Sequence, residues 1–158
     1  MVSARPTALK YIELTGTKLI ASEFREINKL VPNKCGHTTF SIKLNPQFKK
    51  ISGEEFPSKI VQNVEIVIRA FLGEDSSTEE VGSNELAYCK VKVVLSYKVK
   101  KPSFTEQNIL EHQWFFHSQA VLASRPIIKN ILRNTDYSDM PIPYDYLDDI
   151  QISDTPNN

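Results

Sequence analysis

The side chains that could hold a metal are few in this 158-residue chain and are poorly spaced for that role. His112 and His117 fall in a segment of helical periodicity, where a spacing of five residues sets them roughly 140° apart around the helix axis. A shared metal site on a helix needs a spacing of three or four residues. Cys35 and His37 form a Cys-Gly-His string, but a zinc site needs a second pair of ligands. The sequence therefore predicts no metal site and no cofactor.

Residues for catalysis are equally sparse. The five glycines form no glycine-rich phosphate loop. Glu54 with Glu55, and Glu79 with Glu80, are adjacent pairs in polar loop sequence, where neighbouring side chains point apart and stay solvated. Cys89 lies in an alternating apolar segment, where a reduced thiol packs as a small core residue. The sequence thus predicts a binding protein and not an enzyme.

Composition limits the class of protein and its partners. With 41% hydrophobic and 24% charged residues, the chain fits a single globular domain over residues 1–158, with a core at about 9–150 and an acidic, flexible tail at 151–158. Lysine plus arginine and aspartate plus glutamate each number 19, so no global charge favours nucleic acid. No apolar run is long enough to span a membrane, and no secretion signal begins the chain, so we expect a cytoplasmic protein without membrane insertion.

Alternation of apolar and polar residues predicts two long strands in the middle of the chain. From Ala87 to Val99 every odd position is apolar, within a window from Glu85 to Lys100. From Ile60 to Leu72 the alternation has the other parity, since apolar residues at even positions alternate with Asn63, Glu65 and Arg69; the apolar residues are Ile60, Val64, Ile66, Ile68, Ala70 and Leu72. The polar stretch from Gly73 to Asn84 between them predicts a hairpin loop.

Two further strands are expected upstream. One covers Thr38 to Leu44, with Phe40, Ile42 and Leu44 on one side, and Pro46 either ends it or places it at a sheet edge, because proline cannot donate to the ladder. The other, around Leu9 to Phe24, alternates poorly near Gly16 and predicts a bulge there. Four strands joined by loops predict an antiparallel meander.

Helical periodicity replaces alternation after Pro102. Ser103 and Glu106 have the spacing of a capping box. Pro126 predicts a kink or split at about Arg125. Apolar residues from Ile109 to Leu132 form two stripes, which calls for a second buried surface such as another subunit. The stripes are Ile109, Phe116, Ala120, Ala123, Ile127 and Ile131, and Leu110, Trp114, Val121, Ile128 and Leu132.

The segment from Met140 to Ile150 carries two prolines, Pro141 and Pro143, which hold the backbone extended. Ile142, Tyr144 and Tyr146 then become candidates to lie across a neighbouring surface. A strap that merely closes the core is an equally good explanation.

Several of these strings resemble the SecB export chaperones and their relatives in toxin-antitoxin-chaperone systems. The strings are Phe40-Ser-Ile-Lys-Leu44, Ala70-Phe-Leu-Gly-Glu-Asp75, Cys89-Lys-Val91, the long helix containing Pro126, and Pro141-Ile-Pro143. The resemblance implies an α+β fold with a four-stranded antiparallel sheet, a long proline-interrupted helix and a short C-terminal helix. It also implies a homotetramer built as a dimer of dimers, with helices between two sheets.

The same resemblance implies a polypeptide-binding site. Unfolded or aggregation-prone clients lie in apolar grooves of such chaperones, without ATP. Carried over position by position, the client-binding residues would be Phe40, Ile42, Leu44, Leu86, Tyr88, Ile142 and Tyr144. The opposite parity, Cys89, Val91 and Val93, would face the helix and, with Trp114, Phe116 and Val121, hold the oligomer together.

One departure bears on the client. Export-dedicated members end in a tail of cysteine and histidine that binds zinc and docks the export motor, whereas here the last cysteine is Cys89 and the last histidine is His117. This favours a chaperone with a dedicated client, such as an unstable antitoxin, over a general export chaperone. Two other hypotheses stay open: a small-molecule-binding or enzymatic domain with a cavity between sheet and helix near Trp114, and a purely structural subunit of a larger complex.

Overall fold

A computed structural model describes residues 7–29, 34, 36–73, 84–140 and 142 of the chain. A short 3-10 helix, η1 (Thr7–Tyr11), leads into four long strands and two helices. The elements that follow η1 are β1 (Ile12–Glu26), β2 (Gly36–Lys49), β3 (Lys59–Leu72), β4 (Glu85–Val99), α1 (Glu106–Glu111) and α2 (Gln113–Leu132). The predicted α+β class, a four-stranded antiparallel sheet followed by one long and one short helix, is confirmed.

The strands form one antiparallel sheet in the order β1-β4-β3-β2. β2, β3 and β4 make the expected meander, but β1 pairs with β4, so the prediction of a plain four-strand meander is wrong for β1. β3 and β4 are the most apolar strands and take the two interior places, where each is paired on both sides. β1 and β2 become the two edges of the sheet.

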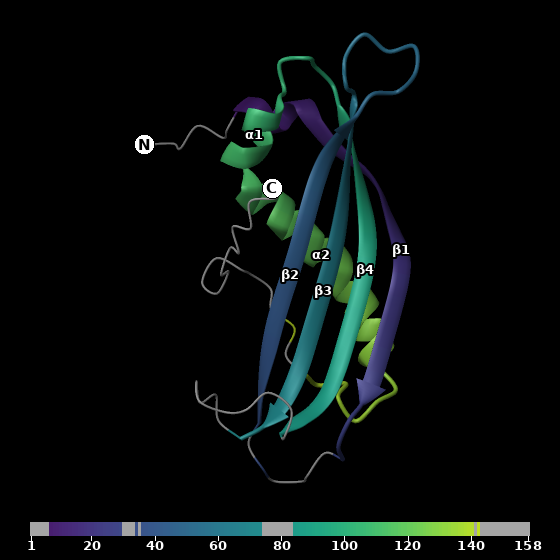
Figure 1. Ribbon diagram of the computed structural model, residues 1–158, viewed down its shortest axis with the longest axis vertical. Coiled ribbons are helices and arrows are strands. Elements are labelled where there is room, and N and C mark those ends of the chain that lie inside the picture. The colour runs from purple at the N-terminus through teal and green to yellow at the C-terminus, as the bar shows by residue number, and fades with distance from the viewer. Residues whose placement is uncertain (1–6, 30–33, 35, 74–83, 141, 143–158) are drawn as a thin grey trace, which may run out of the picture.

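One face of the sheet is buried under α2. The even residues of β3 pair with the odd residues of β4, as in Ile66 with Val91 and Ile68 with Cys89, and all four are about 1% exposed. α2 crosses this face obliquely and contacts β4 and β1 (Figure 1). The alternation read from the sequence therefore identifies the face on which the core forms. We call it the helix face, and the opposite side the outer face.

The edge strands differ from expectation in length and regularity. The register of β1 against β4 shifts between Leu14 and Gly16, which confirms the bulge, and shifts again between Leu19 and Ala21. β2 continues to Lys49 through Pro46 without losing its pairing to β3. It can do so because an edge strand needs ladder donors on one side only.

The helices begin and break at residues other than those predicted. Thr105, not Ser103, caps α1, and Asn108 supplies the reciprocal contact. The chain breaks at His112, whose φ of −119° lies outside the helical region, and not at Pro126. Pro126 removes the hydrogen bond to the carbonyl of Leu122, but Leu122 and Pro126 are both exposed, so water can satisfy that carbonyl. The short helix thus precedes the long one, and most of the expected C-terminal helix lies outside the described residues.

A hydrogen-bonded polar group sits within the apolar core. Gln62 lies at a core position of β3 and is fully buried, and its Oε1 accepts a 2.8 Å hydrogen bond from the hydroxyl of Tyr97. Its Nε2 donates to the carbonyl of Phe116 at 3.3 Å, which ties the sheet to α2. Burial raises the pKa of Tyr97 well above its usual value. The network places one specific turn of α2 against β3 and β4.

Candidate functional site

A row of apolar side chains follows the edge strand β2 along the helix face. Phe40, Ile42 and Leu44 lie opposite Ile68, Ile66 and Val64 of β3, and Phe48 lies opposite Ile60. The β3 residues are buried, whereas the β2 residues are only half-buried and pack against the margin of the core. We call Phe40, Ile42, Leu44 and Phe48 the β2 row. It leaves apolar surface open along one edge of the sheet.

The backbone of β2 beside Ile42, Leu44 and Phe48 faces away from β3. The N–H groups of Val99 and Leu72 donate to the carbonyls of Ser58 and Asn84, at 2.7 and 2.9 Å. Even residues of β3 therefore direct their backbone groups to β4, and odd residues direct theirs to β2. The odd residues of β2 complete that ladder, so the even ones point their N–H and C=O groups away from the sheet. Pro46 fits this parity, since its nitrogen faces the open edge where no ladder donor is needed.

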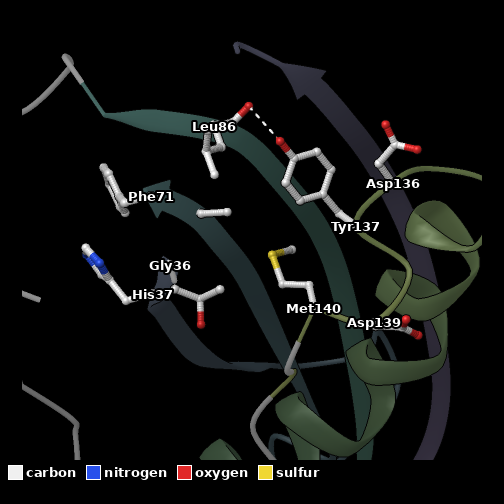
Figure 2. Close-up of a pocket in the computed structure, with 10 residues that line it drawn as sticks. Gly36, His37, Phe71, Leu86, Asp136, Tyr137, Asp139 and Met140 are labelled. Atoms are coloured by element: carbon white, nitrogen blue, oxygen red, sulfur yellow. Dashed lines mark hydrogen bonds between the residues drawn. The ribbon is translucent and has the colours of Figure 1, made fainter. Parts of the chain in front are cut away.

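A cavity of about 240 Å³ opens where β2 begins and β3 ends. Leu86, Tyr137 and Met140 surround it, and the hydroxyl of Tyr137 donates to the carbonyl of Leu86 at 3.3 Å (Figure 2). Gly36 forms part of its wall, and a Cβ there would lie 2.6 Å from the carbonyl oxygen of Phe71. Only glycine allows β2 to start this close to β3. The cavity continues the apolar surface of the β2 row at its N-terminal end.

A bulge decides where Leu86 lies. The register of β4 against β3 shifts by one residue between the Ala70–Ala87 pair and the Phe71–Glu85 pair. Leu86 consequently turns to the helix face, where it is 5% exposed and lines the cavity. Glu85 turns to the outer face and accepts a 2.9 Å hydrogen bond from Nη1 of Arg69. Because Leu86 and Tyr88 are both at even positions, strict alternation predicts that they lie on the same face of the sheet. That prediction is wrong.

Tyr88 lies on the outer face, between two arginines. The guanidinium groups of Arg25 and Arg69 stand 5.0 and 4.9 Å from its ring centroid, close enough for cation–π attraction from both neighbouring strands. β4 is separated from β2 by the whole of β3. Tyr88 therefore does not join the β2 row. The sequence also led us to expect Phe40, Ile42 and Leu44 on the face opposite to Cys89, Val91 and Val93. That expectation is wrong, because both sets lie on the helix face.

The expected client-binding residues therefore do not all lie on one face of the sheet. Ile142 packs against the same core as the β2 row, and Leu86 lines the cavity at the end of that row. Tyr144, like Tyr146, lies outside the described residues. The helix face brings together Phe40, Ile42, Leu44, Leu86 and Ile142 of the seven, and Tyr88 stands apart.

The comparisons with known proteins point to one architecture. No family model matches the chain, and no curated protein sequence matches it. Among solved structures, it is similar to the Mycobacterium tuberculosis SecB-like chaperone Rv1957, solved in complex with a ChAD peptide from the HigA1 antitoxin. The match has a TM-score of 0.50 at 12% sequence identity and covers 85% of this chain and 88% of the other. The chain has a SecB-like fold.

Within this SecB-like fold, the residues expected at an oligomer interface are mostly internal. Cys89, Val91, Val93 and Phe116 are each about 1% exposed in the single chain and belong to one core cluster, so they join α2 to its own sheet. Val121 is 3% exposed. Burial raises the pKa of Cys89 to about 11, which fits an unreactive core thiol. Trp114 alone of the six is open to solvent, at 48%.

Other large apolar residues are exposed, as Trp114 is. Leu110 and Leu122 on the helices are 60% and 57% exposed. Leu14 and Leu19 of β1 pair with Tyr97 and Val93, which places them on the helix face beyond the cover of α2. Leu14 and Leu19 were missed in the sequence because the two bulges disturb the alternation of β1. Their register could not be read without knowing that β1 pairs with β4.

The histidines of the SecB-like fold occupy structural positions. Nδ1 of His112 lies 2.8 Å from the carbonyl of Asn108 at the break between the helices, and Nδ1 of His37 lies 2.9 Å from the carbonyl of Gly73. Burial lowers the pKa of His117. In the described part of the chain, no three His, Cys, Asp or Glu side chains are grouped to hold a metal. None of the described helices is long and apolar enough to cross a membrane.

Proposed function

We propose that the protein is a SecB-like chaperone that binds extended segments of unfolded polypeptides along β2, without ATP. The observation that carries this proposal is the coincidence of two open surfaces on one strand. The β2 row offers half-buried apolar side chains, and Ile42, Leu44 and Phe48 of that row also direct their backbone groups toward the open edge. An extended client can pair with that backbone as an added strand and bury alternate side chains against the row.

The energetics suit a binder of many sequences. Backbone pairing does not depend on side chains, and aliphatic and aromatic contacts tolerate substitution. A fully buried apolar side chain contributes about 1.5–3 kcal/mol, and one that meets a half-open surface contributes less. Several such contacts along one chain, repeated in an oligomer, would add through effective concentration. No fixed catalytic geometry is required.

A dedicated client is favoured over general export. The similar M. tuberculosis chaperone was solved with a peptide of an antitoxin. An antitoxin or a similarly unstable protein, met in the cytoplasm, is the client class that this similarity favours.

Suppression of aggregation tests the function directly. We expect the purified protein, in stoichiometric amount, to reduce light scattering when guanidinium-unfolded citrate synthase is diluted into buffer, with no change on adding ATP. An equal mass of serum albumin serves as the control. Scattering that matches the albumin sample would contradict the proposal.

A small-molecule site is less well supported. The cavity of about 240 Å³ falls below the roughly 300–1,000 Å³ of typical ligand pockets. A larger hollow of about 420 Å³, beside Lys90 and Lys92, lies on the outer face and not between sheet and helix, where the small-molecule hypothesis placed its site. Trp114, which the small-molecule hypothesis placed at the cavity, does not line it and is half exposed. The cavity suits a single client side chain at the end of the β2 row.

Assembly is the second part of the proposal. Contiguous exposed apolar surface marks interaction sites, and Trp114 and Leu122 are the large apolar side chains that α2 exposes and that would contribute to such a surface. We expect the wild-type protein to be a dimer or tetramer and the double variant Trp114→Lys/Leu122→Lys to have a lower mass, measured by size exclusion with light scattering. Ile51→Lys, at a 47% exposed residue outside the strands and helices, should keep the wild-type mass. A wild-type monomer, or an unchanged mass in the double variant, would exclude assembly through this surface.

A further inference from the structure

The outer side of β2 carries only positive charge. Lys43 and Lys49 are the charged residues of this strand, and no aspartate or glutamate occurs between Gly36 and Lys49. Both lysines lie on the outer face, since they pair with Glu65 and Lys59, whose parity is opposite to that of the core residues. Both are exposed, and neither forms an ion pair with any residue that the structure describes. The strand therefore has an apolar side and a basic side.

Among the residues that the structure describes, the carboxylate opposite Lys43 is already engaged. Glu65 lies opposite Lys43 on β3, but its Oε2 is 3.2 Å from Nζ of Lys90 and 3.3 Å from Nζ of Lys92, both on β4. Two ammonium groups thus share one carboxylate on the side away from β2. Lys43 is left exposed on the edge strand with no ion pair to any described residue.

Lys49 belongs to a row of like charges across three strands. It pairs with Lys59, which pairs in turn with Lys98. Neighbouring strands lie about 4.8 Å apart, and like charges directly opposite one another are destabilising. The next residue along, Glu13 of β1, forms its ion pair with Lys100 at 2.9 Å. This end of the sheet would gain stability from a negative group brought to the β2 edge.

We infer, on the basis of the proposed function, that the client segment bound at β2 carries acidic residues alternating with apolar ones. An added strand has the same two-residue period as β2, so one set of its side chains meets the β2 row and the other meets Lys43 and Lys49. These lysines are six residues apart, about 20 Å along the strand, which sets the spacing of the acidic residues that would meet both. The basic side thus selects among the extended sequences that the apolar side would accept.

Peptides that differ only on the outer side test this selectivity. We would measure binding by fluorescence anisotropy of three labelled eleven-residue peptides with Phe and Ile at alternate positions, and with Ser, Glu or Lys at the two positions six residues apart. Wild-type protein should bind the Glu peptide about three- to tenfold more tightly than the Ser peptide, and the Lys peptide more weakly. The preference should disappear near 1 M NaCl, where exposed charges are screened.

Matched variants assign the effect to β2. Lys43→Gln/Lys49→Gln should bind the Ser peptide as wild type does but lose the preference for Glu. Lys18→Gln, on the outer face of the opposite edge strand β1, should retain it. Equal binding of the Glu and Ser peptides to wild type, or an equal loss in Lys18→Gln, would overturn the inference. Failure of the Ser peptide to bind at all would instead count against the proposed function. Displacement of the Glu peptide by a single-stranded oligonucleotide at lower concentration than by unlabelled peptide would mark the basic side as a nucleic-acid surface and overturn the inference.

Discussion

We expect Val91→Asp to leave the chain unfolded in buffer where the wild-type protein is folded. Val91 is 1% exposed at the centre of β4, paired with Ile66 of β3 on one side and Ser22 of β1 on the other. An aspartate there would bury a carboxylate with no partner, which costs on the order of 4–5 kcal/mol or more. Such a cost approaches the whole stability of a typical domain, about 5–15 kcal/mol. Far-ultraviolet circular dichroism and urea unfolding would measure the loss.

Val94→Asp is the matched control for this change. Val94 belongs to the same strand and is the same residue type, but it lies on the outer face and is only half-buried. Its cross-strand neighbours are Asn63 and Lys18, so an aspartate there stays near water and near a positive charge. We expect Val94→Asp to fold, with a urea midpoint close to that of wild type. Equal destabilisation of the two variants would mean that α2 does not define the buried face.

The contrast between these valines shows what a sequence pattern can establish. Alternation over thirteen residues of β4 identified the buried parity, because a strand has a strict two-residue period and the described helices cover only one face of this sheet. The pairing of β3 with β4 also followed, since two such strands flanked one polar stretch. Alternation likewise predicted the strand that contains Phe40, Ile42 and Leu44, whereas its role in client binding was implied by the resemblance to the SecB-like chaperones.

Strand order, bulges and helix breaks could not be read in the same way. The parity of one strand carries no information about which strand lies beside it, so β1 was placed next to β2 and the β2 row was assigned to the wrong face. One extra residue at Leu86 locally reverses which positions of β4 face the helix, and no residue type there indicates the bulge. Pro126 has the stronger local signal for a helix break than His112. However, Pro126 faces solvent, which removes most of the penalty of its missing hydrogen bond.

Ile42→Asp is expected to weaken client binding by at least tenfold. Ile42 lies in the middle of the β2 row, with its side chain on the helix face and its backbone at the open edge. The substitution removes an apolar contact with the client and forces a carboxylate to lose water when the client binds. Anisotropy with the Ser form of the alternating peptide would measure the dissociation constant, because that peptide carries no charge opposite the lysines.

Ser41, the residue next to Ile42, provides a control that separates the effect of the strand face from the effect of the added charge. Ser41→Asp introduces the same negative charge one position away but on the outer face, where the residue is exposed. We expect it to bind the Ser peptide within about twofold of wild type. Ile42 also packs against the core margin, so circular dichroism and thermal unfolding must show that Ile42→Asp is folded, and Ile42→Ser gives a milder change if it is not. An equal loss of affinity in Ser41→Asp would place the client on the outer face, and unchanged affinity in a folded Ile42→Asp variant would remove the β2 row from the binding site. If only Ile42→Asp loses affinity, the client must bury its side chains on the helix face, along the part of β2 that α2 does not cover.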